Sequence, residues 1–369
     1  MKALLILAVL VSGAMAESVR VYIGTGKDGI YTAMLDRETG KLSEPVMAAE
    51  VSGAGFLAVL PGRKLLFATA RPEKKSRQAG GSVTAWKIRD HGKLDRINQQ
   101  PSEGSGPCHV SVDATGNTLL VANYGSGSVA ALKIDEDGSL VKSASAHQHE
   151  GSSVNERRQS GPHAHSFYPG PNNKFAYAPD LGMDKVMIYA LDPEQAGLAE
   201  AGFAKVPPGS GPRHMKFGKD GKQAYVLNEL LLTISVFDLD AATGMFKEKQ
   251  LVDTIEDGID RDGLSCSEIR VHPSGKFIYA AIRDLKDAGR NSVAVFKVLD
   301  GGKLERIQRI DAEIKIPRNI NLDPRGEWLL VAGQRSNEVS VFKVDPGTGK
   351  LSFSGHKVSV PGPMCIEFL

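Results

Sequence analysis

The chain has 369 residues, of which 41% are hydrophobic and 24% are charged, so it has the composition of an ordinary globular protein with a large core. Its 45 basic and 43 acidic side chains give a formal net charge of +2, with no long run of either sign. This balance excludes the charge pattern of a nucleic-acid-binding surface and that of a polybasic membrane anchor. We therefore expect no nucleic-acid partner.

Residues 1–16 predict a secretory signal peptide. Lys2 is the positive n-region, residues 3–11 are the apolar h-region, and Ala14 and Ala16 form an A-x-A cleavage site before Glu17. The apolar run is too short to span a bilayer, and a buried first strand is the alternative. We expect a mature domain of residues 17–369, without a membrane anchor, in the periplasm or the medium.

The rest of the chain is built from one repeat. Segments that begin at Cys108, Arg213 and Arg318 each show a short alternating run, a turn with glycine, an apolar run, a polar turn and a second alternating run. This is a succession of strands at hairpin spacing, and no helical period is sustained. With a fourth strand after the last turn, each unit predicts a four-stranded antiparallel sheet.

The repeat units predict a closed ring. Their first strands align 47 to 57 residues apart, at Phe56, Cys108, His165, Arg213, Ser267, Arg318 and Cys365. The last unit has one strand, whereas residues 20–25 and 30–35 resemble a second and a third strand. We expect the C-terminal strand to complete the N-terminal sheet, because ring closure removes the free edges. The predicted fold is an all-β, seven-bladed β-propeller.

Residues 146–161 are a long polar stretch between two units. We expect a loop here rather than a domain boundary. Loops of this length are usually either functional or flexible, so a lid over the mouth and a disordered surface loop are both possible interpretations.

Two sets of equivalent positions should meet at one mouth of the propeller. First strands line the channel, and antiparallel pairing places the end of each second strand beside the start of the first. The second-strand ends are Gly26, Arg71, Tyr124, Leu181, Glu229, Arg283 and Gln334. These positions diverge into an imidazole, a carboxylate and several guanidiniums, which indicates a site rather than a scaffold.

Four of these side chains carry the predicted chemistry: His165, Arg213, Glu229 and Arg283. Guanidiniums bind carboxylates or phosphates and neutralise a developing oxyanion, and His165 or Glu229 could activate water or move a proton. The set suits attack on, or formation of, an ester carbonyl in an anionic substrate. We predict these four as catalytic residues, and as substrate-binding residues we predict His163, Arg71, Arg318, Gln334 and Asn228.

Other titratable groups carry weaker signals. A metal site at His147, His149, His163 and His165 is a minor alternative, because a long loop separates the pairs. We expect His214 to be structural. The chain has three cysteines, Cys108, Cys266 and Cys365, and is large enough to form a core without disulfide bonds. We therefore expect neither an essential disulfide nor a cysteine nucleophile.

Several motifs together resemble the seven-bladed lactonase family. They are GPHAHS at 161–166, APDLGMDKV at 178–186, GPRHM at 211–215, LNEL at 227–230, HPSGKFIYAAIR at 272–283 and PMCIEFL at 363–369. The family includes propeller-type 6-phosphogluconolactonases and fungal 3-carboxy-cis,cis-muconate lactonizing enzymes. Its proposed active-site set falls on His165, Arg213, Glu229 and Arg283, and the resemblance implies no obligatory metal or cofactor.

The sequence thus predicts an exported, 6-phosphogluconolactonase-like enzyme of carbohydrate metabolism that hydrolyses a sugar-type or carboxylate-bearing lactone. The predicted export favours an unphosphorylated substrate, because phosphorylated sugars are held in the cytoplasm. A muconate-type cycloisomerase and a non-enzymatic ligand- or protein-binding propeller are the alternatives. We expect a lactone as the small-molecule partner and a monomeric protein.

Overall fold

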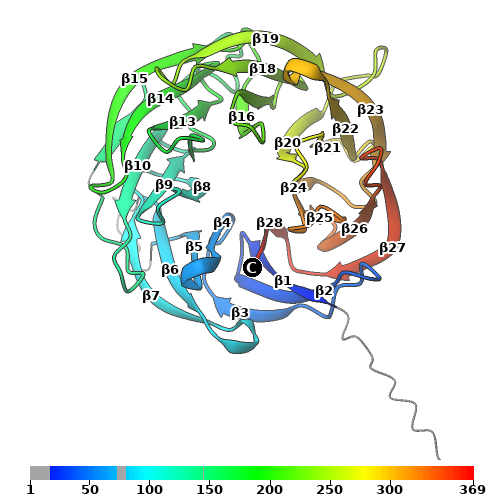
Figure 1. Cartoon of the computed structure of the whole chain (residues 1–369), viewed down its shortest axis with the longest axis horizontal. Coiled ribbons are helices and arrows are strands. Elements are labelled where there is room, and N and C mark those ends of the chain that lie inside the picture. Colours follow the sequence, from blue (N-terminus) through cyan, green and yellow to red (C-terminus); the bar gives the residue numbers. More distant parts are fainter. Residues whose placement is uncertain (1–16, 73–79, 144) are drawn as a thin grey trace, which may run out of the picture.

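The computed structural model describes residues 17–72, 80–143 and 145–369, and these residues form a seven-bladed propeller. Seven four-stranded antiparallel sheets stand in a ring around a central axis (Figure 1). The predicted fold class is confirmed. The predicted signal peptide, residues 1–16, lies outside the described residues. Within the described part of the chain, no helix has the length and apolar character needed to cross a membrane.

Six blades are continuous in sequence, and each runs from the channel outwards. Their strands are β4 (Leu57–Leu60), β5 (Leu65–Ala70), β6 (Ser82–Ile88) and β7 (Leu94–Pro101); β8 (Pro107–Val112), β9 (Thr118–Asn123), β10 (Ser128–Lys133) and β11 (Ser145–Gln148); β12 (Tyr168–Pro169), β13 (Phe175–Asp180), β14 (Lys185–Asp192) and β15 (Gly197–Lys205). The chain continues through β16 (Pro212–Phe217), β17 (Gln223–Asn228), β18 (Thr233–Leu239) and β19 (Phe246–Asp253); β20 (Leu264–Val271), β21 (Phe277–Asp284), β22 (Ser292–Val298) and β23 (Leu304–Asp311); β24 (Pro317–Leu322), β25 (Trp328–Gly333), β26 (Glu338–Val344) and β27 (Leu351–Ser359). Short 3₁₀ turns are η1 (Pro61–Arg63), η2 (Asp90–Gly92) and η3 (Asp300–Gly302).

The seventh blade joins the two ends of the chain. Its strands are β28 (Pro363–Phe368), β1 (Ser18–Thr25), β2 (Gly29–Asp36) and β3 (Val46–Glu50), in that order from the channel. β28 lies beside β1 (Figure 1) and pairs antiparallel with it. In this pairing Ile366 lies opposite Ile23. The predicted closure by the C-terminal strand is therefore confirmed.

Neighbouring blades are joined by apolar packing and by a repeated tyrosine contact. The hydroxyl of Tyr225, on a second strand, donates to the carbonyl of Gly302 in the next blade at 3.1 Å. Three other second-strand tyrosines make the same contact with a glycine carbonyl of the next blade: Tyr22 with Gly92, Tyr177 with Gly244 and Tyr279 with Gly349. These buried hydroxyls find partners across the blade interface, as buried tyrosines require. The contacts help to hold the inner strands in register around the channel.

Because β28 closes the ring, we predict that truncating a buried side chain of this strand strongly lowers the free energy of unfolding. Ile366 is fully buried in the apolar cluster between β28, β1 and the preceding blade. We expect Ile366→Ala to lower the free energy of unfolding by about 2–5 kcal/mol, measured by urea denaturation. Val46→Ala, at a residue 55% exposed on the outer strand β3, is the control and should change it by less than about 0.5 kcal/mol. Equal effects of the two substitutions would contradict this account of closure.

Candidate functional site

β-Bulges aim the residues of the channel ring. In β16 the pairing with β17 shifts between Pro212 and His214, so Arg213 is an extra residue without an opposite partner. The same shift leaves Cys108 extra in β8 and Arg318 extra in β24. A bulge re-aims the side chain of its extra residue. The ring positions therefore depend on a local backbone irregularity as well as on the repeat.

A short sequence pattern accompanies each of these bulges. The extra residue follows a proline, and the residue before that proline has positive φ: Gly106 (62°), Gly211 (61°) and Ile316 (55°). Glycine accepts this left-handed conformation without strain, whereas Ile316 adopts it at a cost.

The same bulge corrects one predicted ring residue. In β28 the pairing shifts between Pro363 and Cys365, so Met364 is the extra residue. Met364 borders the cavities at the mouth, whereas Cys365 is fully buried beside the backbone N–H of Leu57. The prediction of Cys365 at this position was wrong by one residue, because a bulge shifts the strand by one residue.

The carboxylate of Glu229 is the centre of the candidate site. Its Oε2 lies 2.7 Å from Nη1 of Arg213, 3.3 Å from Nη2 of Arg283 and 4.0 Å from Nε2 of His165. Arg213 also contacts Nε2 of His165 directly. The structure thus brings together the four residues predicted as catalytic, and each is at most 5% exposed.

Burial and charge set the protonation of this group. Burial opposes ionisation of Glu229, but the guanidiniums of Arg283 and Arg213 outweigh it and hold the pKa of Glu229 well below its usual range. Burial, reinforced by the guanidinium of Arg213, lowers the pKa of His165 well below its ordinary 6.5. Burial lowers the pKa of Arg283 to about 10. At neutral pH the site therefore holds a carboxylate, charged guanidiniums and a neutral imidazole.

Two cavities adjoin this group at the mouth. One, of about 250 Å³, is lined by Arg213, Arg318 and Arg71, and the other, of about 410 Å³, is lined by Arg283, Arg318 and Gln334. Arg318, Gly26 and Met364 border both. The predicted substrate-binding residues Arg71, Arg318 and Gln334 thus face the space beside the catalytic set.

Arg318 differs from the other guanidiniums of the mouth. Within the described residues it has no hydrogen-bond or ion-pair partner. Burial, with the repulsion of Arg213 and Arg283, lowers its pKa well below the usual range. A half-buried guanidinium without a counter-charge is ready to bind an anion.

The other two predicted substrate-binding residues do not line these cavities. Asn228 is fully buried, and its amide donates to the hydroxyls of Thr233 and Ser235 within its own blade. The structure therefore gives Asn228 a structural contact. His163 stacks on Tyr124 at 4.4 Å between ring centroids, and its Nδ1 lies 2.9 Å from the Tyr124 carbonyl, so it supports the wall of the site.

The polar stretch 146–161 is partly strand and partly an anchored loop. Its first residues belong to β11, which pairs with β10, so the expectation of a loop from residue 146 was wrong. Beyond β11, the carboxylate of Asp184 accepts hydrogen bonds from the side chains of Ser153 and Gln159. The loop is thus fastened to the blade that carries His165.

This loop carries Arg158, a residue of the site that was not predicted from the sequence. Nη2 of Arg158 lies 2.9 Å from Oε1 of Glu229 and 3.3 Å from the hydroxyl of Tyr124. Comparing repeat units could not identify Arg158, because a loop residue has no equivalent in the other blades.

The remaining histidines and cysteines were considered in the sequence as metal ligands or nucleophiles, and of them Cys108 lines the smaller cavity, with its Sγ 3.2 Å from the carbonyl of His165. His149 lies between Asp180, at 2.6 Å, and the hydroxyl of Tyr189, at 2.9 Å. No group of three metal-ligating side chains occurs among residues 17–72, 80–143 and 145–369. Cys108, Cys266 and Cys365 are unpaired, and burial raises the pKa of Cys108 to about 12, which disfavours a thiolate nucleophile.

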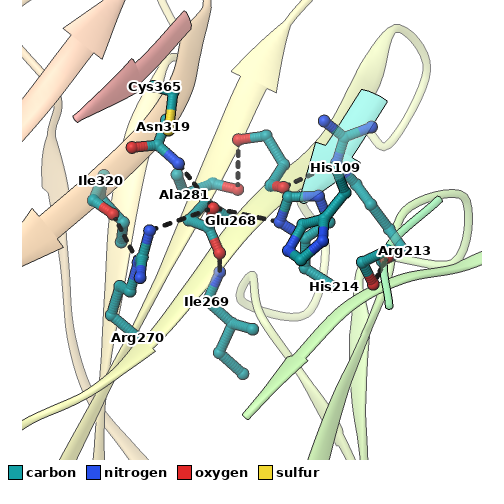
Figure 2. A network of polar contacts seen from close by, with 12 residues as sticks. His109, Arg213, His214, Glu268, Ile269, Arg270, Ala281, Asn319, Ile320 and Cys365 are labelled. Carbon is teal, nitrogen blue, oxygen red and sulfur yellow. Dashed lines mark hydrogen bonds and ion pairs between the residues drawn. The ribbon is translucent and has the colours of Figure 1, made fainter. Parts of the chain in front are cut away.

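A second ring of side chains lies one residue further along the innermost strands. Figure 2 shows its carboxylate, Glu268, beside His214, Arg270 and Asn319. Oε2 of Glu268 accepts a hydrogen bond from the Asn319 amide at 2.6 Å and lies 3.1 Å from Nδ1 of His214. Burial lowers the pKa of His214 to about 4, so this imidazole is neutral at pH 7. His214 also lines the smaller cavity together with Arg213, so the structural role expected of it stays a prediction.

The guanidinium of Arg318, which has no partner among the described residues, is predicted to lower the stability of the fold. We expect Arg318→Gln to raise the free energy of unfolding by about 1 kcal/mol, because it removes a cation repelled by Arg213 and Arg283. Urea denaturation at low ionic strength measures the change. Lys219→Gln, at an exposed lysine, is the control and should have little effect. A loss of stability in Arg318→Gln would show that this charge has a stabilising partner.

Comparison with known proteins places the chain among lactonases. The model of the family described as lactonase, 7-bladed beta-propeller, matches residues 20–368. A 6-phosphogluconolactonase of Bacillus subtilis is 36% identical over 94% of this chain and 97% of its own length, and one of Formosa agariphila is 30% identical over 92% and 95%. The structure of a periplasmic gluconolactonase of Pseudomonas aeruginosa superposes with a TM-score of 0.87 at 30% identity, over 96% of this chain and 99% of that one. The chain belongs to the seven-bladed β-propeller lactonase family.

Proposed function

We propose that this protein is a 6-phosphogluconolactonase-like enzyme that hydrolyses a sugar-type or carboxylate-bearing lactone to the hydroxy acid. The observation that carries the proposal is the buried Glu229 carboxylate, in contact with Arg213 and Arg283 and 4.0 Å from His165. It lies beside a cavity lined by Arg318, which has no partner among the described residues. Support also comes from the relatives in Bacillus subtilis and Formosa agariphila, which bear the name 6-phosphogluconolactonase.

The reaction needs a base, an oxyanion partner and a route for one proton. A water molecule attacks the lactone carbonyl and transfers a proton to the base, while guanidiniums stabilise the oxyanion that forms. The tetrahedral intermediate then breaks the bond from the carbonyl carbon to the ring oxygen. That oxygen takes up the proton as a hydroxyl, and the water oxygen remains in the new carboxyl group.

His165 is better suited than Glu229 to act as the base. The pKa of Glu229 is held far below its usual range by Arg283 and Arg213, so this carboxylate accepts a proton poorly. His165 is neutral at pH 7 and its Nε2 contacts Arg213, so substrate must displace that contact before Nε2 takes a proton. We assign His165 as the base, Glu229 to orienting the guanidiniums, and Arg213 and Arg283 to the oxyanion.

The excess of positive charge favours an anionic substrate. Arg213, Arg283 and Arg318 face the two cavities, and Glu229 is the carboxylate that Arg213 and Arg283 share. Binding a carboxylate or phosphate would offset the repulsion among them.

We also propose that the protein is exported and begins at Glu17. The order of charged, apolar and small residues in positions 1–16 supports this, and one structural relative is named as a periplasmic enzyme. Fractionation of the native host followed by N-terminal sequencing tests it. A cytoplasmic protein that retains residues 1–16 would refute the proposal.

Purified protein from Glu17 onward should hydrolyse lactones above the spontaneous rate. We expect His165→Asn to lower kcat by about 10² or more, because it removes the general base, in a pH-indicator assay with phosphorylated and unphosphorylated sugar lactones. His356→Asn, on the outer strand β27, is the matched control and should retain activity. Full activity in His165→Asn would reject the assigned role. Consumption of a muconate-type dicarboxylate without water uptake would indicate a cycloisomerase, and ligand binding without turnover a binding propeller.

The lowered pKa of His165 predicts how kcat/KM changes as the pH falls below 7. A base of pKa 6.5 would retain about a third of its neutral-pH activity at pH 6, whereas a lower pKa keeps the imidazole neutral there. We therefore expect kcat/KM for uncharged D-glucono-1,5-lactone to change less than about twofold between pH 7 and pH 6 and to fall at lower pH. An inflection at or above pH 6.5 would contradict this assignment.

A further inference from the structure

The loop after β11 brings one more guanidinium to the site. Arg158 uses only Nη2 in its hydrogen bonds to Glu229, at 2.9 Å, and Tyr124, at 3.3 Å. An arginine has five N–H donors in a planar fork, and among the described residues the donors on the other edge of this guanidinium have no hydrogen-bond partner, so they can bind a ligand.

Exposure separates Arg158 from the other cations on Glu229. The side chain of Arg158 is 37% exposed, whereas those of Arg213 and Arg283 are 3% and 6% exposed. Of these three cations, Arg158 is therefore the most accessible to solvent. It is bound to Oε1 of Glu229, while Arg213 and Arg283 share Oε2, so it stands across the same carboxylate from the proposed oxyanion partners.

Buried hydrogen bonds hold the loop in place beside Arg158. The neighbouring Gln159 is fully buried and donates to Oδ1 of Asp184 and to the carbonyl of Leu181, each at 2.8 Å. Asp184 also accepts a hydrogen bond from the backbone N–H of Gly211 at 2.7 Å, two residues before Arg213. One buried carboxylate thus anchors both the loop that carries Arg158 and the turn that leads to Arg213.

We propose that Arg158 is a further substrate-binding residue, which selects lactones that bear a carboxylate or a phosphate monoester. The inference rests on the proposed function and deepens it by naming the substrate class. A fixed, part-exposed guanidinium with free donors binds such an anion bidentately and orients the lactone over Arg213 and Arg283. A neutral sugar lactone lacks the group that Arg158 would hold.

The test compares three lactones in three proteins. The lactones are D-glucono-1,5-lactone, which is neutral, D-glucaro-1,4-lactone, which bears a carboxylate, and 6-phospho-D-glucono-1,5-lactone, which bears a phosphate. The proteins are the wild type, Arg158→Gln and the matched control Arg157→Gln, at the adjacent exposed arginine. We expect Arg158→Gln to lower the ratio of kcat/KM for an anionic lactone to that for the neutral one by about tenfold or more, through KM.

Arg157→Gln should leave that ratio at the wild-type value. Arg158→Lys, added as a fourth protein, should keep part of that ratio, because the charge remains while the planar fork is lost. The two anionic lactones show whether the carboxylate or the phosphate is preferred. An equal loss on charged and neutral lactones in Arg158→Gln would overturn the inference and leave the proposed function standing.

A binding measurement separates failure of the inference from failure of the proposed function. Calorimetric titration with D-glucarate and with 6-phosphogluconate needs no turnover. We expect Arg158→Gln to weaken binding of at least one of them by about tenfold relative to both the wild type and Arg157→Gln. Absence of lactone hydrolysis by the wild type would defeat the proposed function, and unchanged binding in Arg158→Gln would defeat the inference.

Discussion

The buried carboxylate of Glu229 is the interaction on which the arrangement of the mouth depends. Arg213, Arg283 and Arg158 converge on its two oxygens from two blades and a loop, and without this anion they would repel one another in a poorly solvated space. A buried ion group of this kind is poor evidence of stability, since desolvation offsets much of the attraction. Its value lies in holding guanidiniums at fixed positions before substrate arrives, as electrostatic catalysis requires.

The propeller supplies the rigidity that such a cluster needs. The charges come from neighbouring blades, so their separations depend on how one blade stands against the next. Apolar packing and the buried hydroxyl of Tyr225, bonded to Gly302 of the following blade, resist changes in that angle. Pairing of β28 with β1 closes the ring and leaves no blade free to splay. Packing between the blades and ring closure thus stabilise a fold whose charged site costs free energy, because its charges are buried.

The sequence predicted the site residues that occupy equivalent positions in the repeat, and it missed those that a bulge or a loop places at the mouth. His165, Arg213, Glu229 and Arg283 were found because each occupies an equivalent place in a blade, and equivalent places meet at one mouth. Met364 was missed in favour of Cys365 because a bulge adds one residue before the regular pairing resumes. Arg158 was missed because the path of a loop has no period. The second ring around Glu268 was missed because a bulge lets two consecutive residues, such as Arg213 and His214, both line the mouth.

Strand alternation and repeat spacing are local properties of the chain, so the seven blades, the closure by the last strand and the four central residues could be predicted from the order of the amino acids. Other features became visible in the folded protein alone: Asn228 bonds within its own blade, and Arg318 lacks a partner among the described residues. Asp184 anchors a distant loop, and Arg158 of that loop reaches Glu229. The contacts of Asp184 with Gln159 and of Arg158 with Glu229 join segments far apart in the chain. Their geometry follows from packing, which the spacing of residues along the sequence does not encode.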